Sequence, residues 1–153
     1  MLGGKSLYQY GINPILWSDP WGWSGKPANS PSLEKWIEKK GGTAHTEIET
    51  RTWVFSDWED NTVRYSNGYP DFKPYEIQSV NIEGLKGNHG KGLSGDFGRA
   101  DMAAPQGKAN YALNTWHHHE NGTTMQEVPK SVHNRFTHRG GVSKTLKGCA
   151  GQK

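Results

Sequence analysis

Residues 114–141 constrain the fold of this 153-residue chain more than any other segment. Within them, Asn121-Gly122 is the dipeptide most typical of a tight β-hairpin turn. The residues before it, 114–120, and those after it, 123–128, suit the two strands of such a hairpin. Pro129 then suits the first turn of a helix, which a double glycine would end. The pattern therefore predicts a strand, a tight turn, a returning strand and a helix, in that order.

Histidines are concentrated in this segment, which holds five of the chain's seven within 22 residues: His117, His118, His119, His133 and His138. Side chains alternate along a strand, so the three adjacent histidines cannot all point the same way. Two of them can still serve one site where the strand ends, and a helix docked on the hairpin would bring His133 beside them. Imidazole is the commonest metal-binding side chain and a natural base near neutral pH. The cluster therefore predicts a metal site with an adjacent base.

Two structural alternatives apply to the same cluster. A single histidine in such a position is more often a surface or hydrogen-bonded residue than a ligand, but five in a hairpin–helix pattern favour a site. A structural zinc site usually closes four ligands around the metal. Because Cys149 is the single cysteine, such a site would need four histidines, which is an uncommon choice.

Several motifs around the histidines occur together in one known family. They are Trp116-His117-His118, Asn121-Gly122, Met125-Gln126-Glu127-Val128-Pro129, His133 and His138-Arg139-Gly140-Gly141. With them, residues 69–143 resemble the WHH branch of the HNH/endonuclease VII nucleases, which are ββα-metal enzymes found as the toxin tips of bacterial polymorphic toxins. The resemblance implies an α+β fold, with a small ββα-metal (His-Me finger) core and a loop-rich mixed N-terminal decoration.

The resemblance also implies a role for most of these histidines. His117 would be a metal ligand, His118 the general base and His133 a second ligand from the helix. His138 would be a third ligand or a phosphate contact, although it follows His133 by five residues, where colicin-type members place their two helix ligands four apart. Five residues correspond to about 140° around an ideal helix, so we expect His138 to reach back from a frayed last turn. The cation would be Zn²⁺, or Mg²⁺ or Mn²⁺ with waters in the open positions, and the role of His119 stays open.

Positive charge is concentrated near the C-terminal end. Residues 123–153 contain six Lys or Arg and one acidic residue, a balance of +5 within a total of +3. A basic end suits a polyanionic partner such as nucleic acid, and a solvated basic tail is the alternative. Lys130, Arg135 and Arg139 are candidate phosphate contacts, or else solvated surface charges. We expect the ring of Trp116 to pack in the core rather than to stack on a base.

A second resemblance concerns the N-terminal segment. Its residues are Leu7-Tyr8-Gln9-Tyr10, Asn13-Pro14, Trp17 and Asp19-Pro20-Trp21-Gly22-Trp23. They resemble the end of an Rhs-repeat core, the DPxGL-type border that precedes a variable toxin tip, with Trp23 where the family has Leu. The resemblance implies release of the tip by self-cleavage after Trp23, with Asp19 as one of the two aspartates required. Because the second aspartate would precede Leu2, we expect this chain not to cleave itself.

The resemblances divide the chain into three parts. Residues 1–23 are the end of the Rhs core, 24–68 a spacer and the N-terminal part of the tip, and 69–153 the nuclease domain. The sequence also predicts helices at 32–42 and 94–104 and strands at 46–55, 62–65 and 76–82. The last of these strands alternates weakly, as an edge strand does.

Composition excludes several other classes of protein. Twenty glycines and eight prolines interrupt nearly every window, which rules out a long coiled coil or an all-helical bundle. No run approaches the roughly 20 apolar residues of a membrane-spanning helix, and the mean hydropathy is −0.88. Aromatic residues make up 11%, too many for a disordered chain. The composition favours a small, loop-rich domain whose core depends on a few large rings.

Together these features predict a metal-dependent endonuclease toxin that hydrolyses phosphodiester bonds, with DNA favoured as substrate by the resemblance. It would be a secreted effector, delivered by a secretion system such as type VI into the cytoplasm of competing bacterial cells. Its partners would be a cognate immunity protein and the Rhs core shell of the parent toxin, with no membrane involved. The alternatives are an RNase of the same fold, a non-enzymatic zinc- or nucleic-acid-binding module, and a scaffold segment of the Rhs shell.

Overall fold

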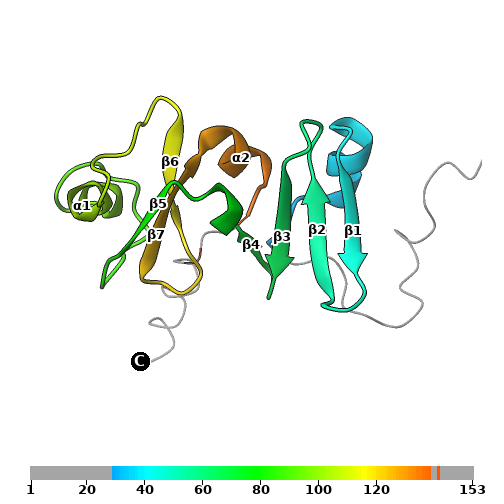
Figure 1. Ribbon diagram of the computed structural model, residues 1–153, viewed down its shortest axis with the longest axis horizontal. Helices are drawn as coiled ribbons and strands as arrows, with labels where there is room; N and C mark the ends of the chain where they lie inside the picture. Colours follow the sequence, from blue (N-terminus) through cyan, green and yellow to red (C-terminus); the bar gives the residue numbers. More distant parts are fainter. Residues whose placement is uncertain (1–28, 139–140, 142–153) are drawn as a thin grey trace, which may run out of the picture.

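Two antiparallel sheets with a helix between them make up the described part of the chain (Figure 1). The computed structural model describes residues 29–138 and Gly141. Its elements in chain order are η2 (Lys35–Lys39), β1 (Thr43–Glu47), β2 (Thr52–Ser56), β3 (Thr62–Ser66), β4 (Tyr69–Asp71), η3 (Lys73–Tyr75), β5 (Gln78–Asn81), α1 (Asp96–Ala103), β6 (Asn114–His118), β7 (Thr124–Pro129) and α2 (Lys130–Arg135). One sheet has the strand order β1-β2-β3-β4 and the other β5-β7-β6. The fold is α+β, as predicted.

The four-stranded sheet is a meander whose core is aromatic. Phe55 of β2 and Tyr65 of β3 are buried together with Trp36 of η2, which is 1% exposed. The indole N–H of Trp36 lies 3.1 Å from each of two carbonyl oxygens, those of Thr43 and Ser56, at the ends of β1 and β2. These contacts hold η2 against the sheet. The helix predicted over 32–42 thus forms as a short π-helical segment with its tryptophan turned inward.

The prediction of a single strand over residues 46–55 is wrong. The structure forms two strands there, β1 and β2, joined by a turn at residues 48–51. Arg51 adopts a positive φ of 54° in this turn. No glycine, proline or asparagine marks the turn in the sequence, so the local pattern alone favours one strand. Packing decides otherwise, because Ala44 and Phe55 pair across the hairpin and are both buried in the core.

The predicted hairpin–helix unit is formed by β6, β7 and α2. The side-chain oxygen of Asn121 accepts two backbone N–H groups of the returning chain, at 3.0 and 2.9 Å, which stabilises the turn. Pro129 ends β7 and is the residue before α2, so the helix begins where it was predicted. It ends earlier than predicted, at Arg135. β5 pairs with β7 at the edge of this sheet, as the pattern of 76–82 indicates.

Two apolar cores lie on opposite sides of this unit. Val132 and Phe136 pack into the core of the four-stranded sheet. Trp116 and Met125 of the hairpin pack instead with Phe97 of α1, and Trp116 is in the core as expected. Figure 1 shows the result, with α1 on one side of the three-stranded sheet and α2 on the other. The four-stranded sheet therefore supports the helix that carries part of the histidine cluster.

The predicted three-part division of the chain stays a prediction. Asp19 and Trp23, the expected cleavage border, lie outside the described residues. β4 begins at Tyr69 and pairs with β3, so residues on the two sides of the expected boundary at 68/69 share one sheet. None of the helices in the described residues combines the length and the apolar character that crossing a membrane requires.

Candidate active site

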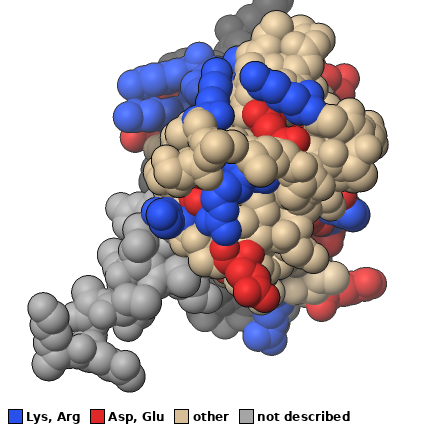
Figure 2. Space-filling view, turned by 90° about the vertical axis from the view of Figure 1, so that its left-hand side faces the viewer, with Lys and Arg blue, Asp and Glu red and all other residues tan. Residues whose placement is uncertain are grey.

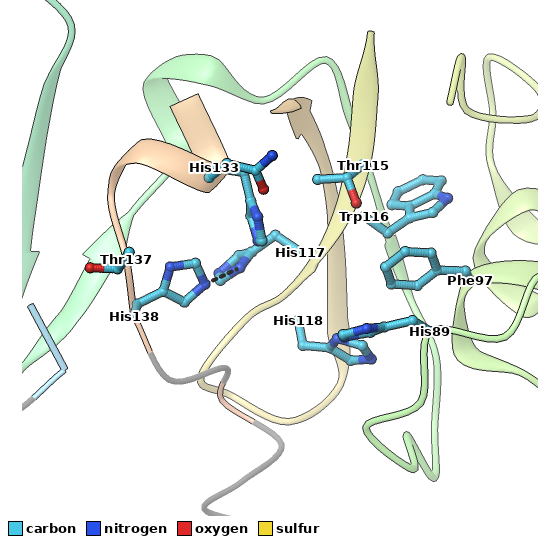
Figure 3. A pocket seen from close by; sticks show the side chains of 10 residues that line it. His89, Phe97, Thr115, Trp116, His117, His118, His133, Thr137 and His138 are labelled. Carbon is cyan, nitrogen blue, oxygen red and sulfur yellow. Dashed lines mark hydrogen bonds between the residues drawn. The ribbon is translucent and has the colours of Figure 1, made fainter. Parts of the chain in front are cut away.

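The adjacent histidines of β6 lie in different surroundings. His117 and His118 are only 3% and 6% exposed. Because side chains alternate along a strand, the two rings point to opposite sides. Figure 3 shows the ring of His117 directed toward His133 and His138, whereas His118 lies beside His89. One strand end therefore supplies two separate chemical groups.

His117, His133 and His138 form a compact triad. One ring nitrogen from each lies within 4.8 Å of the other two, and His117 Nδ1 is 3.2 Å from His138 Nε2. The buried ring of Phe72, which follows β4, packs against all three imidazoles at centroid distances of 4.8, 5.6 and 5.2 Å. The structure thus brings together the three histidines that the resemblance marks as metal ligands.

His138 reaches the triad because α2 ends early. The backbone leaves the helical conformation at Phe136, with φ −84° and ψ 77°, so His138 does not belong to the helix. The carbonyl of Phe136 accepts a hydrogen bond from His138 Nδ1 at 2.9 Å. This bond places the proton on Nδ1 and leaves the Nε2 lone pair facing His117. The five-residue spacing from His133 is accommodated by this turn of the chain rather than by a frayed helix.

The second glycine of the predicted helix stop has another role. The N–H of Gly141 donates to the carbonyl of His118 at 3.3 Å. A Cβ at this position would overlap the backbone of Glu120, so only glycine permits the close approach. The contact ties the chain after the triad to the end of β6.

The triad imidazoles are neutral near pH 7. Burial, reinforced by the neighbouring imidazoles, lowers the pKa of His117 well below its ordinary value. Burial, followed by the effect of His138, lowers the pKa of His133 to about 4. Burial also lowers the pKa of His138, against the opposing hydrogen bond to Phe136. Neutral imidazoles present lone pairs, which is the form that binds a cation.

The donor set fits a divalent metal ion. Among the described residues, this triad is the group of histidine, cysteine and carboxylate side chains that could hold one. Three imidazole ligands with an oriented outer partner are typical of zinc and other first-row metals. Three protein ligands leave coordination positions for water and substrate, as catalytic sites do and closed structural sites do not.

The His118 ring is paired with a buried carboxylate. Its Nε2 lies 3.0 Å from Oδ2 of Asp96, the first residue of α1, which is 0% exposed. Burial by itself would raise the pKa of Asp96. Hydrogen bonds from the Lys86 N–H, the His118 ring and the Asn88 N–H outweigh burial and hold that pKa below its ordinary value. An ionised carboxylate only accepts hydrogen bonds, so His118 carries its proton on Nε2 and keeps Nδ1 as an acceptor.

His118 is also neutral near pH 7. Burial lowers its pKa, and the hydrogen bond and charge of Asp96 oppose this effect only in part. A neutral imidazole with a lone pair on one nitrogen and a carboxylate on the other has the arrangement of a general base.

Both histidine environments border one cavity of about 440 Å³ (Figure 3). Its lining comes from β6, from α2 and the residues after it, and from the segment around the start of α1: His89, Phe97, Thr115, Trp116, His117, His118, His133, Asn134, Thr137 and His138. A volume of this size is in the range of small-ligand sites. The cavity can therefore hold a substrate group between the triad and His118.

Two of the candidate phosphate contacts have protein partners. Arg135 donates to Asp57 at 2.9 Å and to Glu59 at 2.6 Å, which joins α2 to the β2–β3 turn. Lys130 Nζ donates to the carbonyl of Tyr111. Their role toward phosphate stays a prediction, and these contacts show what else each side chain does.

The remaining predicted residues are placed as follows. Arg139 lies outside the described residues. His119 is in the hairpin turn, where its Nδ1 accepts the N–H of Asn121 at 3.2 Å. It is not a member of the triad.

Sequence reasoning missed Asp96, His89 and Phe72. Asp96 and His89 precede His118 by 22 and 29 residues, and nothing in their local pattern connects them with it. The one available signal was the density of glycines in residues 84–95, directly before a predicted helix. A glycine-dense loop next to a helix start often approaches a ligand or another backbone closely.

A β-hairpin followed by a helix, with histidines that converge and a paired imidazole beside them, is consistent with the core of a ββα-metal nuclease. Residues 109–148 match a family described as a nuclease of the HNH/ENDO VII superfamily with conserved WHH. The matched segment contains the motif as Trp116, His117 and His118. The match confirms the predicted enzyme class, a nuclease that hydrolyses phosphodiester bonds. No curated protein matches the chain.

Proposed function

We propose that the chain is a metal-dependent endonuclease. The observation that carries this proposal is the convergence of the triad on the same cavity that the Asp96-paired His118 lines. Phosphodiester hydrolysis needs both parts, because the diester is negatively charged and water is a weak nucleophile. The match of residues 109–148 to WHH nucleases supports the same class.

His118 is the general base of the proposed reaction. Its Nδ1 accepts a proton from a water molecule, while Nε2–H stays bonded to Asp96, whose charge stabilises the imidazolium. The water oxygen forms a bond to phosphorus as the bond from phosphorus to the leaving 3′ oxygen breaks. The leaving oxygen takes up a proton from solvent. The products are a 5′-phosphate and a 3′-hydroxyl.

His117, His133 and His138 would hold the metal. When bound, a divalent cation there neutralises charge on the phosphate and on the leaving oxygen. Imidazole ligands suit Zn²⁺, and Mg²⁺ or Mn²⁺ with additional waters is the alternative. Phe72 packs behind the three rings and holds them in place for this role.

Incubation with plasmid DNA and with total RNA, with and without EDTA, tests this proposal. We expect cleavage of the plasmid, its loss in EDTA and its recovery when Zn²⁺, Mg²⁺ or Mn²⁺ is added in excess. Cleavage of RNA alone would make the chain an RNase of the same fold. Cleavage of either substrate that resists prolonged chelation would contradict metal dependence.

We further propose that the nuclease is the toxin tip of an Rhs polymorphic toxin, delivered into competing bacterial cells and neutralised by an immunity protein. The border-like residues around Asp19 and Trp23 and the resemblance to WHH toxins support this context. Controlled expression in a bacterial host tests it. The wild-type chain should stop growth and degrade DNA, whereas the His118→Ala variant should be tolerated. Normal growth with active, soluble nuclease in the cytoplasm would contradict a toxin role.

A further inference from the structure

A glycine-rich loop outside the WHH-matched segment contributes one side chain, His89, to the wall of the cavity. Residues 84–95 contain five glycines and lead into α1. A Cβ at Gly95 would overlap the backbone of Gly90, whose carbonyl also accepts the N–H of Gly98 at 3.0 Å. The path of this loop therefore depends on glycine and is held by backbone contacts.

Asp96 joins this loop to His118. Its Oδ2 accepts the N–H groups of Lys86 and Asn88 at 2.9 and 3.1 Å, and the side chain of Asn88 accepts the N–H of Asp96 at 2.8 Å. The same Oδ2 bonds with Nε2 of His118. The neighbour of Asn88 in the chain, His89, is therefore held in a defined position relative to His118.

The loop presents His89 to the cavity. The His89 ring packs with Phe97 at 5.0 Å and with His118 at 5.7 Å between centroids. Figure 3 shows it on the wall opposite His133 and His138. The ring forms no hydrogen bond or ion pair with the other described residues, although it reaches the surface. Its N–H group is free to bind a ligand in the cavity.

Within the part of the chain that the structure describes, a phosphate in this cavity has few other cationic or strongly polarised donors. No lysine or arginine is among the described residues that line it. Arg135 is held by carboxylates, and Arg99 donates to the carbonyls of Glu83 and Gly84, where the loop begins. The N–H of His118 is directed to Asp96. His89 is therefore the imidazole beside the base whose N–H has no partner among residues 29–138 and Gly141.

The surface outside this wall suits a polyanion. Figure 2 shows Lys and Arg side chains gathered in the upper part of the face that α1 occupies, with acidic side chains between them. Lys91 of the loop and Lys108 lie 4.2 and 5.8 Å from the ring centroid of Tyr111. The Tyr111 ring in turn stacks on Phe97 at 6.3 Å. A nucleic acid strand that binds to these two lysines lies close to His89.

We propose that His89 binds the scissile phosphate, donating a hydrogen bond from its ring N–H to a non-bridging oxygen from the wall opposite the triad. This inference rests on the proposed nuclease function. The bond strengthens as negative charge grows on the phosphate oxygens in the transition state, so His89 affects kcat more than substrate binding.

Two substitutions separate the donor from the ring. His89→Phe keeps the packing on Phe97 and removes the donor, whereas His89→Gln keeps a donor and removes the ring. His45→Phe on β1, an exposed histidine outside the cavity lining, is the matched control. Cleavage of a duplex oligonucleotide is measured under single turnover and at steady state. Affinity for Zn²⁺ without nucleic acid is measured by competition with a chromophoric chelator, and Tm is recorded for every variant.

We expect His89→Phe to lower kcat by about 10- to 100-fold with KM changed less than about threefold. His89→Gln should retain more activity, and zinc affinity and the His45→Phe control should match the wild type. Full activity in His89→Phe would overturn the inference while leaving the nuclease proposal intact. Equal losses in both variants with a lower Tm, or weakened zinc binding, would show a structural role and overturn it too. A wild-type chain that cleaves neither DNA nor RNA defeats the proposed function itself, and this inference with it.

Discussion

His117 and His118 are neighbours in the sequence, yet in the structure they contact different groups on opposite sides of β6. On one side of β6, His117 meets two imidazoles and the ring of Phe72. On the other side, His118 meets the carboxylate of Asp96. Neutral imidazoles suit a shared cation, whereas a carboxylate selects the tautomer of a base and stabilises its protonated form. In the proposed mechanism, the alternation of side chains along β6 therefore separates metal binding from proton transfer, so that each can be altered alone.

The largest effect is expected from His117→Ala, on the triad side. Removing this ligand should lower zinc affinity by more than about 100-fold. The loss of a group that only hydrogen-bonds a metal ligand already lowers metal affinity by about 10- to 100-fold. Cleavage should fall to background at limiting metal. Chelator competition and plasmid cleavage measure the two effects. The control is His119→Ala, which removes a histidine of the hairpin turn two residues after His117 and should behave as the wild type.

His118→Ala should separate the two sides. Loss of the general base should lower the cleavage rate by about 10²- to 10⁴-fold, while zinc affinity and Tm stay near those of the wild type. Single-turnover kinetics and chelator competition on the same preparation measure this. An equal loss of zinc affinity would contradict the separation of the two sides. An unchanged cleavage rate, zinc affinity and Tm would favour a non-enzymatic binding module.

Asp96→Asn should weaken the base side without removing it. The amide oxygen can still accept the Nε2–H of His118, but it lacks the charge that stabilises the imidazolium. We expect kcat to fall by roughly 10- to 100-fold, with KM changed less than about threefold. Asp101→Asn is the matched control on the same helix, because Asp101 accepts from the Trp116 indole and the Tyr111 hydroxyl, both at 2.9 Å. Asp101→Asn should lower Tm and leave kcat unchanged, and an Asp96→Asn variant that does the same would mark Asp96 as merely structural.

The smallest effect on activity is expected from Asp57→Asn, which alters the support of the triad side. The Asp57 carboxylate holds Arg135 of α2 at 2.9 Å. Burial would raise its pKa, but hydrogen bonds from Arg135 and Asn61 outweigh burial and lower it. Losing the charged bond should reduce the free energy of unfolding by about 1.5–3 kcal/mol, with zinc affinity changed little. Chemical denaturation measures the change.

The same variant has a defined pH dependence. The folded-state pKa of Asp57 lies below its unfolded value of about 3.9, so its stabilisation is complete above that pH and is lost as pH falls through the folded value. The stability difference between wild type and Asp57→Asn should therefore be constant above about pH 5 and narrow below about pH 4. A difference that stays constant down to pH 2 would show that the carboxylate charge does not contribute.

Local chemistry explains which features the sequence could predict. The side chain of Asn121 accepts the backbone of its own turn, and Pro129 is suited to precede a helix wherever it occurs. These signals act over a few residues, so the hairpin, the helix start and the candidate histidines on them followed from the sequence. The spacing of His133 and His138 was harder to interpret, because it depends on where α2 ends, and the change of conformation at Phe136 decides that.

The features that the sequence did not predict have one physical origin, which is contact between residues far apart in the chain. The turn between β1 and β2 contains no turn-forming glycine or proline, and only the burial of paired core residues requires it. Arg135 reads as a free cation in a basic segment until Asp57 is placed beside it, 78 residues away in the chain. The local sequence around Asp57 or Arg135 does not predict their contact.

By itself, the sequence determined the hairpin–helix unit and the places of His117 and His133 on it, because turn chemistry and strand periodicity act between near neighbours. The change of conformation at Phe136 decided that His138 joins them. Only the tertiary structure decided what stands on the other side of β6. Asp96 and His89 come to His118 through the docking of α1 and a glycine-built loop, and Phe72 comes to the triad from the neighbouring sheet. Such approaches depend on packing and burial over the whole domain, to which no short stretch of residues is a guide.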